Sequence, residues 1–297
     1  MPRATESRRG PGTVRIGRRA LPYALLAPGA AWLLVFFVVP LFYMGRLSLE
    51  SGVVGSLEFS WEWSNYTDAL SLYDEHFVRS FVYAGLATLF ALLLAYPLAY
   101  VIAFRAGRWR NLLLFAVIAP FLTTYLVRTL AWETILADQS PVTKALDFLG
   151  LAPGGHVLAT GGAVIAGLTY NFLPFMVLPI YASLERLDER LIEAAKDLYA
   201  SAAQAFWRVT LPLSAPGIVA GTLLTFIPAS GDYVNAQFLG SASNQMIGNV
   251  VQSLYLKQAD YPSAAALSFV LMAAIMVVVL LYIRFAGSEA LMGEEPR

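Results

Sequence analysis

Six long apolar stretches place the strongest limit on how this chain can fold. A helix crosses a bilayer with about 20 mostly apolar residues, at a rise of about 1.5 Å each. Stretches of that length run over residues 22–45, 78–103, 112–134, 161–182, 213–235 and 264–285. Hydrophobic residues make up 58% of the sequence and charged residues only 13%, against about 25% charged residues in soluble domains. The sequence therefore predicts an all-α polytopic membrane protein with about six spans.

The two ends of the chain lie outside these stretches. Residues 1–20 carry six arginines and predict a basic tail, and residues 286–297 predict a second tail. The apolar run from Leu21 to Leu49 exceeds the 7–15 residues that are typical of a signal-peptide core, and it lacks a small-residue cleavage pattern. We therefore expect it to remain as the first span of a transmembrane domain over residues 21–285.

Charges in the links between the spans predict the orientation. Lys and Arg gather in the cytoplasmic links of membrane proteins, and they occur in the links 104–111 and 183–211. The link 46–77 instead holds six carboxylates against the single Arg46: Glu50, Glu58, Glu62, Asp68, Asp74 and Glu75. An even number of spans puts both termini on one side. We therefore predict a multi-pass membrane protein with both termini in the cytoplasm.

The link over residues 183–212 predicts an amphipathic helix that lies outside the bilayer. Asp188 is a suitable N-cap, and apolar residues then recur at helical spacing at Leu187, Leu191 and Leu198. A helix lying on the membrane surface would show the same stripe. That alternative does not explain the Ala194–Ala195 pair, which is small enough to approach the groove of another protein closely.

This link resembles the permease subunits of ABC importers, whose penultimate cytoplasmic loop carries the pattern E-A-A-x3-G-x9-I-x-L-P. The matching positions here are Glu193, Ala194, Ala195, Tyr199, Val209, Leu211 and Pro212. Tyr199 replaces the family glycine, and because tyrosine resists a positive φ, we expect the turn after the helix to be built differently. The resemblance implies a coupling helix that enters a groove of a cytoplasmic ATPase. Its contact residues would be Glu193, Ala194, Ala195, Asp197, Leu198 and Tyr199.

The resemblance extends from about Leu21 to Phe285 and is closest to the permeases of spermidine/putrescine importers, on residues 171–188 and 222–251. It implies the type I ABC importer permease fold. The implied partners are a second homologous permease, a cytoplasmic ATPase dimer, an external solute-binding protein and membrane lipid. Lys+Arg and Asp+Glu are equal at 20 each, so charge gives no reason to expect nucleic acid.

The sequence has no phosphate-binding loop of the type GxxxxGK[ST]. We therefore expect no cofactor on this chain, with ATP and Mg²⁺ bound by the partner ATPase, so that the chain is a transport subunit and not an enzyme. An intramembrane enzyme would need a nucleophile with a base, or a metal cluster, and the predicted spans contain no His or Cys. An ion-coupled secondary transporter, which needs no ATPase, stays as an alternative, as does the same permease role for another small organic solute.

Ionisable residues inside spans are costly and suggest a solute pathway. Glu133 and Asp232 would each lie roughly 30 Å along a straight helix from the cytoplasmic end, near the outer mouth. Carboxylates beside aromatic rings suit a cationic polyamine, through ion pairing and cation–π attraction. The candidate pathway residues are Asp232, Glu133, Tyr233, Trp132, Tyr125 and Asn171.

Other roles are open for several of these residues. Glu133 can reach the membrane interface, and Asp232 can cap a helix interruption made by Pro228 and Gly231. Asn171, near the middle of its span, needs a partner from another helix or from a passing solute. Arg128 would repel a cation, so we expect it to pair with a carboxylate or with backbone carbonyls.

Overall fold

The structure is a computed structural model, and it describes residues 21–52, 55–150 and 152–286. The predicted tails therefore lie outside the described residues, except for Ala286, which ends the last helix. The chain divides into two units, Met1–Leu47 and Ser48–Arg297.

The first unit contains one long apolar helix. It consists of α1 (Leu21–Leu33), a π-helical turn η1 (Leu34–Val38) and α2 (Val39–Leu47). Its segment Leu25–Leu47 has a mean hydropathy of 2.3, and 0% of it is buried within the chain. An apolar helix of this length with this little burial among the described residues suits a surrounding of lipid or of another apolar protein surface.

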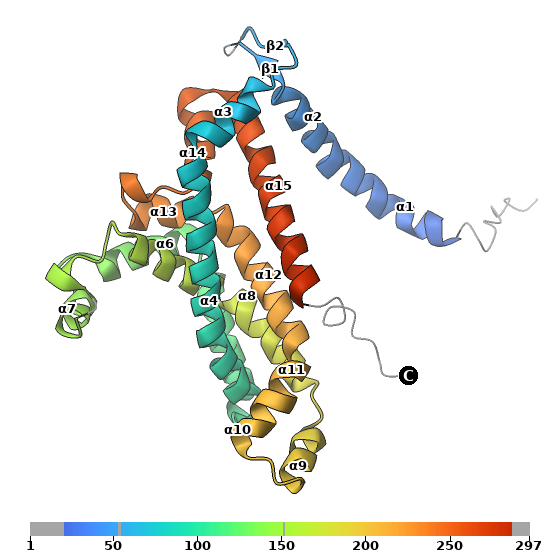
Figure 1. The fold of residues 1–297 in the computed structure, drawn as a ribbon, viewed down its shortest axis with the longest axis vertical. Helices are drawn as coiled ribbons and strands as arrows, with labels where there is room; N and C mark the ends of the chain where they lie inside the picture. The colour runs from blue at the N-terminus through green and yellow to red at the C-terminus, as the bar shows by residue number, and fades with distance from the viewer. Residues whose placement is uncertain (1–20, 53–54, 151, 287–297) are drawn as a thin grey trace, which may run out of the picture. The chain divides into compact units, whose positions relative to one another are not determined.

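The second unit is built around three helices that pack side by side (Figure 1): α4 (Asp74–Phe104), α8 (Gly161–Glu185) and α12 (Ala215–Ser230). Alanines at helical spacing line the buried face of α4 and are fully buried: Ala84, Ala87, Ala91, Ala95 and Ala99. On α12, an added Cβ at Gly217 would lie 2.6 Å from the Pro179 carbonyl oxygen of α8. Small residues thus let these helix backbones approach closely, as is usual in membrane bundles.

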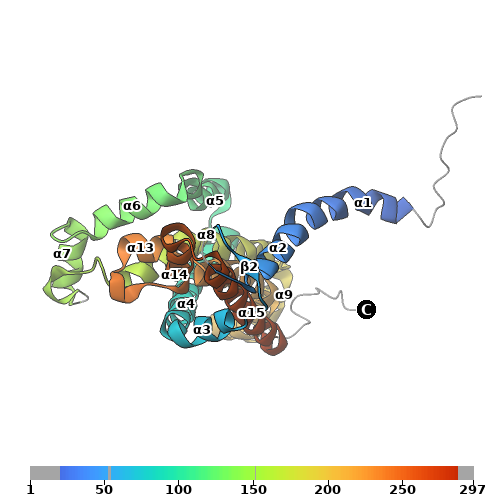
Figure 2. The same cartoon turned by 90° about the horizontal axis from the view of Figure 1, so that it is seen from above.

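The third predicted span is broken, which the sequence did not predict. A 3₁₀ turn η2 (Gly107–Trp109), α5 (Arg110–Ile118) and a second 3₁₀ turn η3 (Ala119–Leu122) precede α6 (Tyr125–Leu136), and the two halves meet at 95°. Pro120 lies in η3, and Thr123 and Thr124 are extended. Since α6 runs almost at right angles to α5 (Figure 2), the straight-helix depth predicted for Glu133 is wrong.

The fifth predicted span is also interrupted. A short helix α10 (Ala202–Ala205), a π-helical turn η5 (Phe206–Thr210) and α11 (Leu211–Leu213) meet α12 at 61°. Helix α12 then ends at Ser230, so the predicted span 213–235 is wrong at its end, and α13 (Val234–Leu239) begins after a three-residue break. Four described helices are long and apolar enough to cross a membrane, and each of the two bent pairs can be one further span. This agrees with six spans.

The second unit has further elements beside these helices and at their ends (Figure 1). A small hairpin pairs β1 (Glu50–Ser51) with β2 (Glu58–Phe59), and α3 (Ser64–Leu72) leads into α4. Later elements are α7 (Pro141–Phe148), η4 (Pro153–Gly155), η6 (Ala242–Asn244), α14 (Ile247–Ser253), η7 (Leu254–Gln258) and α15 (Tyr261–Ala286). The short helix α9 (Glu189–Asp197) lies at the end opposite to the hairpin.

Candidate functional site

The predicted coupling helix is present as α9. It follows α8 after a link of three residues, and the Asp188 carboxylate accepts a hydrogen bond from the Arg190 N–H at 3.0 Å, which confirms the predicted N-cap. No residue of α9 is buried. Leu191 is 49% exposed and Leu198 is 82% exposed, so the described residues leave much of this apolar stripe uncovered.

The turn after α9 contradicts the prediction that Tyr199 changes it. Tyr199 has a φ of +59°, the left-handed conformation that a glycine would adopt. The Tyr199 N–H donates to the Lys196 carbonyl at 2.9 Å, and the Ala200 N–H donates to the Ala195 carbonyl at 3.1 Å. These two bonds form a Schellman motif. The tyrosine therefore keeps the glycine geometry, at a cost of about 1–2 kcal/mol, and its side chain is 98% exposed.

The far end of the same loop is fixed in the helix bundle. Ser201 and Gln204 form a reciprocal capping box that starts α10. Phe206 then packs against two rings of α4, with centroids 5.6 Å from Tyr96 and 6.1 Å from Tyr100. The loop is thus joined to α8 at one end and to α4 at the other.

Asp232 lies in the break between α12 and α13, and its side chain is used within the chain. One carboxylate oxygen accepts from the Asn235 backbone N–H at 2.8 Å and from the Asn235 side-chain amide at 3.2 Å. The other oxygen accepts from the Tyr125 hydroxyl. Asp232 is only 8% exposed. Asp232 therefore caps the chain at the helix interruption, as the alternative to a pathway role predicted.

A hydrogen-bond network brings three of the candidate residues together across α6, α8 and α13. The Asn171 amide donates to the Asn235 side-chain oxygen at 3.0 Å, and the Asn235 amide donates to the Tyr125 hydroxyl at 2.6 Å. Asn171 is fully buried and finds its partner on another helix. Asn235 was missed by the sequence reasoning, although its place three residues after Asp232 suits the first turn of a capped helix.

Among the residues that the structure describes, Arg128 does not pair with a carboxylate or a carbonyl as predicted. It is 6% exposed, and its Nε and Nη1 atoms have no hydrogen-bond partner among the described residues. Its guanidinium instead lies over the rings of Phe121 and Tyr125, at 4.9 and 5.7 Å from their centroids. Cation–π attraction to two rings takes the place of the expected ion pair.

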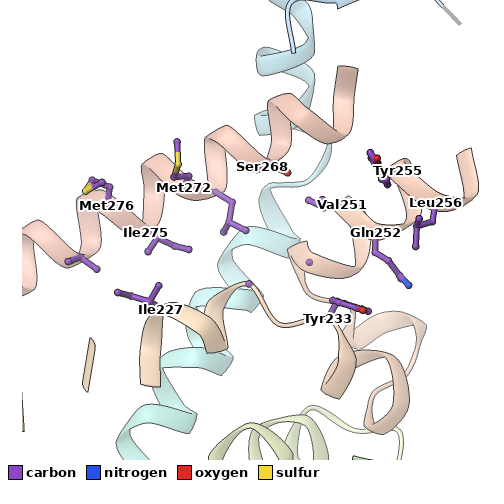
Figure 3. A pocket seen from close by; sticks show the side chains of 14 residues that line it. Ile227, Tyr233, Val251, Gln252, Tyr255, Leu256, Ser268, Met272, Ile275 and Met276 are labelled. Atoms are coloured by element: carbon purple, nitrogen blue, oxygen red, sulfur yellow. The ribbon is translucent and has the colours of Figure 1, made fainter. Parts of the chain in front are cut away.

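The other three candidates lie apart from this network. Trp132 packs against Tyr170, with ring centroids 5.3 Å apart, and Glu133 is half-buried on α6. Tyr233 lines a groove of about 700 Å³ between α12, α14, η7 and α15, where Met272 and Met276 also lie (Figure 3). Although Tyr233 follows Asp232 in the chain, the two side chains thus meet different surroundings.

The chain is similar in sequence to known transport proteins. Residues 19–290 match the family described as binding-protein-dependent transport system inner membrane component. The spermidine/putrescine transport system permease protein PotB of Escherichia coli (strain K12) is 38% identical over 256 residues, which cover 85% of this chain and 93% of that protein.

Two solved structures have a similar fold. One is a crystal structure of a bacterial ABC transporter involved in the import of the acidic polysaccharide alginate, with a TM-score of 0.70 and 19% identity over 91% of this chain and 96% of that one. The other is the bacterial alginate ABC transporter in complex with alginate pentasaccharide-bound periplasmic protein, with a TM-score of 0.68 and 19% identity over 92% and 96%. They confirm the predicted type I importer permease fold.

The family match spans more than half of the chain, and the PotB relative is matched over nearly its whole length. The permease prediction is therefore confirmed over an ion-coupled secondary transporter or an intramembrane enzyme. This chain belongs to the binding-protein-dependent transport system inner membrane component family, as a multi-pass permease subunit of an ATP-driven ABC importer of the bacterial inner membrane.

Proposed function

We propose that this permease imports a small cationic solute of the polyamine class, such as spermidine or putrescine. The observation that carries the proposal is the 38% identity to the E. coli spermidine/putrescine permease over 93% of that protein. A buried carboxylate at a helix break, with a phenol against it, gives the proposal a chemical basis, because an ammonium group can replace the phenol as the donor to Asp232.

Asp232 is buried and hydrogen-bonded within the chain in this structure. Tyr125 and Asn235 fill the hydrogen-bonding positions around the carboxylate, and Asp232 is 8% exposed. For a solute to bind, α6 has to move away from α13 so that the Tyr125 hydroxyl releases Asp232. The buried guanidinium of Arg128 lies over the Tyr125 ring. Its charge disfavours a second cation, such as a solute ammonium group, at the same place. A passing polyamine would therefore meet Asp232 in one state of the cycle only.

In the proposal, the exposed face of α9 couples movement of the spans to ATP hydrolysis. Glu193, Ala194, Asp197, Leu198 and Tyr199 are exposed and Ala195 is half-buried. This set offers two small residues for close approach, two carboxylates, and an exposed apolar pair in Leu198 and Tyr199. In the proposal, α9 fits a groove of a cytoplasmic ATPase that binds ATP and Mg²⁺, and both termini of this chain lie in the cytoplasm.

The proposed assembly contains three further kinds of protein. A second homologous permease completes the path, two ATPase subunits bind the coupling helices, and an external solute-binding protein delivers the solute. The periplasmic protein named in the alginate transporter complex supports this last partner.

Reconstitution with a panel of solutes tests the proposal. The full complex is placed in proteoliposomes with its binding protein, and ATP hydrolysis and uptake of labelled solute are measured. Spermidine or putrescine should stimulate both. A response confined to sugars or anions would reject the polyamine proposal while leaving the permease role in place.

A further inference from the structure

Arg110 joins the start of α5 to the last turns of α8. Its Nη2 forms an ion pair with the Glu185 carboxylate, and its Nε donates to the Tyr181 hydroxyl. The guanidinium carbon also lies 5.1 Å from the centroid of the Tyr181 ring. Tyr181 and Glu185 are four residues apart, so they share one face of α8 and hold a single cation between them.

The positive charge of Arg110 stabilises the end of α8 more than it stabilises the start of α5, its own helix. A helix carries partial positive charge at its N-terminus and partial negative charge at its C-terminus. Arg110 is the first residue of α5, where a cation is unfavourable, whereas Glu185 is the last residue of α8, where a cation is favourable. The contact is therefore an interaction between helices and does little to hold α5 together.

Packing already holds α5 against α8 without this ion pair. Leu113, Leu114 and Val117 pack on the apolar cluster that contains Ile180 and Leu184. The side chains of Arg110 and Glu185 are 33% and 45% exposed, and pairs with this much solvent contribute little to stability. The ion pair is thus expected to matter more for how the two helices move than for whether they fold.

The two ends of this contact lead to the two functional regions. Glu185 is three residues before Asp188, the N-cap of α9, and the Leu187 N–H bonds back to the Leu184 carbonyl at 3.2 Å. In the other direction, α5 leads through the 95° bend to Tyr125, which donates to Asp232. The Arg110 contacts therefore connect the coupling helix to the bent span at the candidate solute site.

We propose that Arg110, Tyr181 and Glu185 form an ion-pair latch that passes movement of α9 to α5 and α6. This rests on the proposed function, in which an ATPase moves α9. When the end of α8 moves with α9, the latch carries the start of α5 with it and shifts Tyr125 relative to Asp232. Arg110 and Glu185 are thus positioning residues. Without the latch, the apolar packing between α5 and the cluster on α8 remains, and apolar contacts have no fixed direction.

Charge reversal in the full importer complex tests the latch. The variants are Arg110→Glu, Glu185→Arg and the double variant that exchanges the two charges. Each is reconstituted with its partner permease, ATPase and binding protein, and labelled spermidine uptake is divided by ATP hydrolysed. The control is Arg108→Glu, since Arg108 is an exposed cation two residues away whose guanidinium lies over Trp109.

Each single reversal should lower uptake per ATP by about fivefold or more, which is the lower range of coupling between sites. The double variant should recover most of this loss, and Arg108→Glu should retain the wild-type ratio. Single variants with a normal ratio, or a double variant no better than the worse single one, would overturn the latch alone. A wild-type chain that recruits no ATPase would overturn the proposed function, and the latch with it.

Discussion

Replacing Tyr199 by glycine should make the end of the coupling helix more stable. Tyr199 holds a φ of +59° while its side chain is 98% exposed, so its ring contributes no packing within the chain that glycine would lose. Relief of the left-handed conformation is worth about 1–2 kcal/mol. The greater backbone freedom of glycine takes back about 0.5–1 kcal/mol. The net gain is about 0.75 kcal/mol from the midpoints of these two ranges, a three- to fourfold decrease in local opening.

Hydrogen exchange measures this gain directly. The amides of Tyr199 and Ala200 donate to Lys196 and Ala195, so peptides over residues 189–205 report opening of the turn in nanodiscs. The matched control is Tyr199→Ala, which removes the ring but keeps a Cβ and thus most of the left-handed cost. Exchange should be slower only in Tyr199→Gly. Equal exchange in the two variants, or faster exchange in Tyr199→Gly, would refute the assignment of strain to this residue.

Three further predictions follow from the packing and the buried network. Asp232→Asn keeps a capping side chain but removes the charge. It should weaken spermidine uptake about 30-fold, since loss of a buried ionic partner is worth at least about 2 kcal/mol. An unchanged KM for spermidine would contradict the pathway role. Asn235→Ala removes three side-chain hydrogen bonds and should destabilise the detergent-purified complex by about 2 kcal/mol, seen as a lower thermal midpoint; a wild-type midpoint for the alanine variant would show that the network is not stabilising. Gly217→Ala places a Cβ 2.6 Å from the Pro179 carbonyl oxygen, whereas Gly85→Ala on α4 meets nothing within 4 Å, so only the first should lower the midpoint, by about 1–3 kcal/mol of stability; equal midpoints would show that α8 and α12 do not pack this closely.

Apolar length predicted the spans well where the helices are continuous. The predicted stretches 78–103, 161–182 and 264–285 fall within α4, α8 and α15. The same signal could not show the bend between α5 and α6, because a broken span and a straight one have the same composition. Pro120 was visible in the sequence, but proline also occurs inside continuous helices here, as Pro97 does in α4.

The candidate site was predicted in part. The loop pattern around Glu193 predicted the position of helix α9, because helix capping and apolar spacing act within a few residues. The partners of Asp232 were harder to predict, since Tyr125 and Asn235 reach it from different helices. The predicted partner of Arg128 was wrong, because its guanidinium lies over two aromatic rings and not beside a carboxylate. The prediction for the turn at Tyr199 was also wrong. Hydrogen bonds of the turn hold Tyr199 at a positive φ, a conformation that a tyrosine disfavours by itself.

The most direct test of the coupling role uses a single cysteine, because the natural chain has none. Glu193→Cys in the assembled importer should cross-link to the ATPase subunit, and a membrane-impermeant thiol reagent added to intact cells should leave it unlabelled. Labelling from outside the cell, or cross-linking to lipid alone with none to the ATPase, would contradict the account.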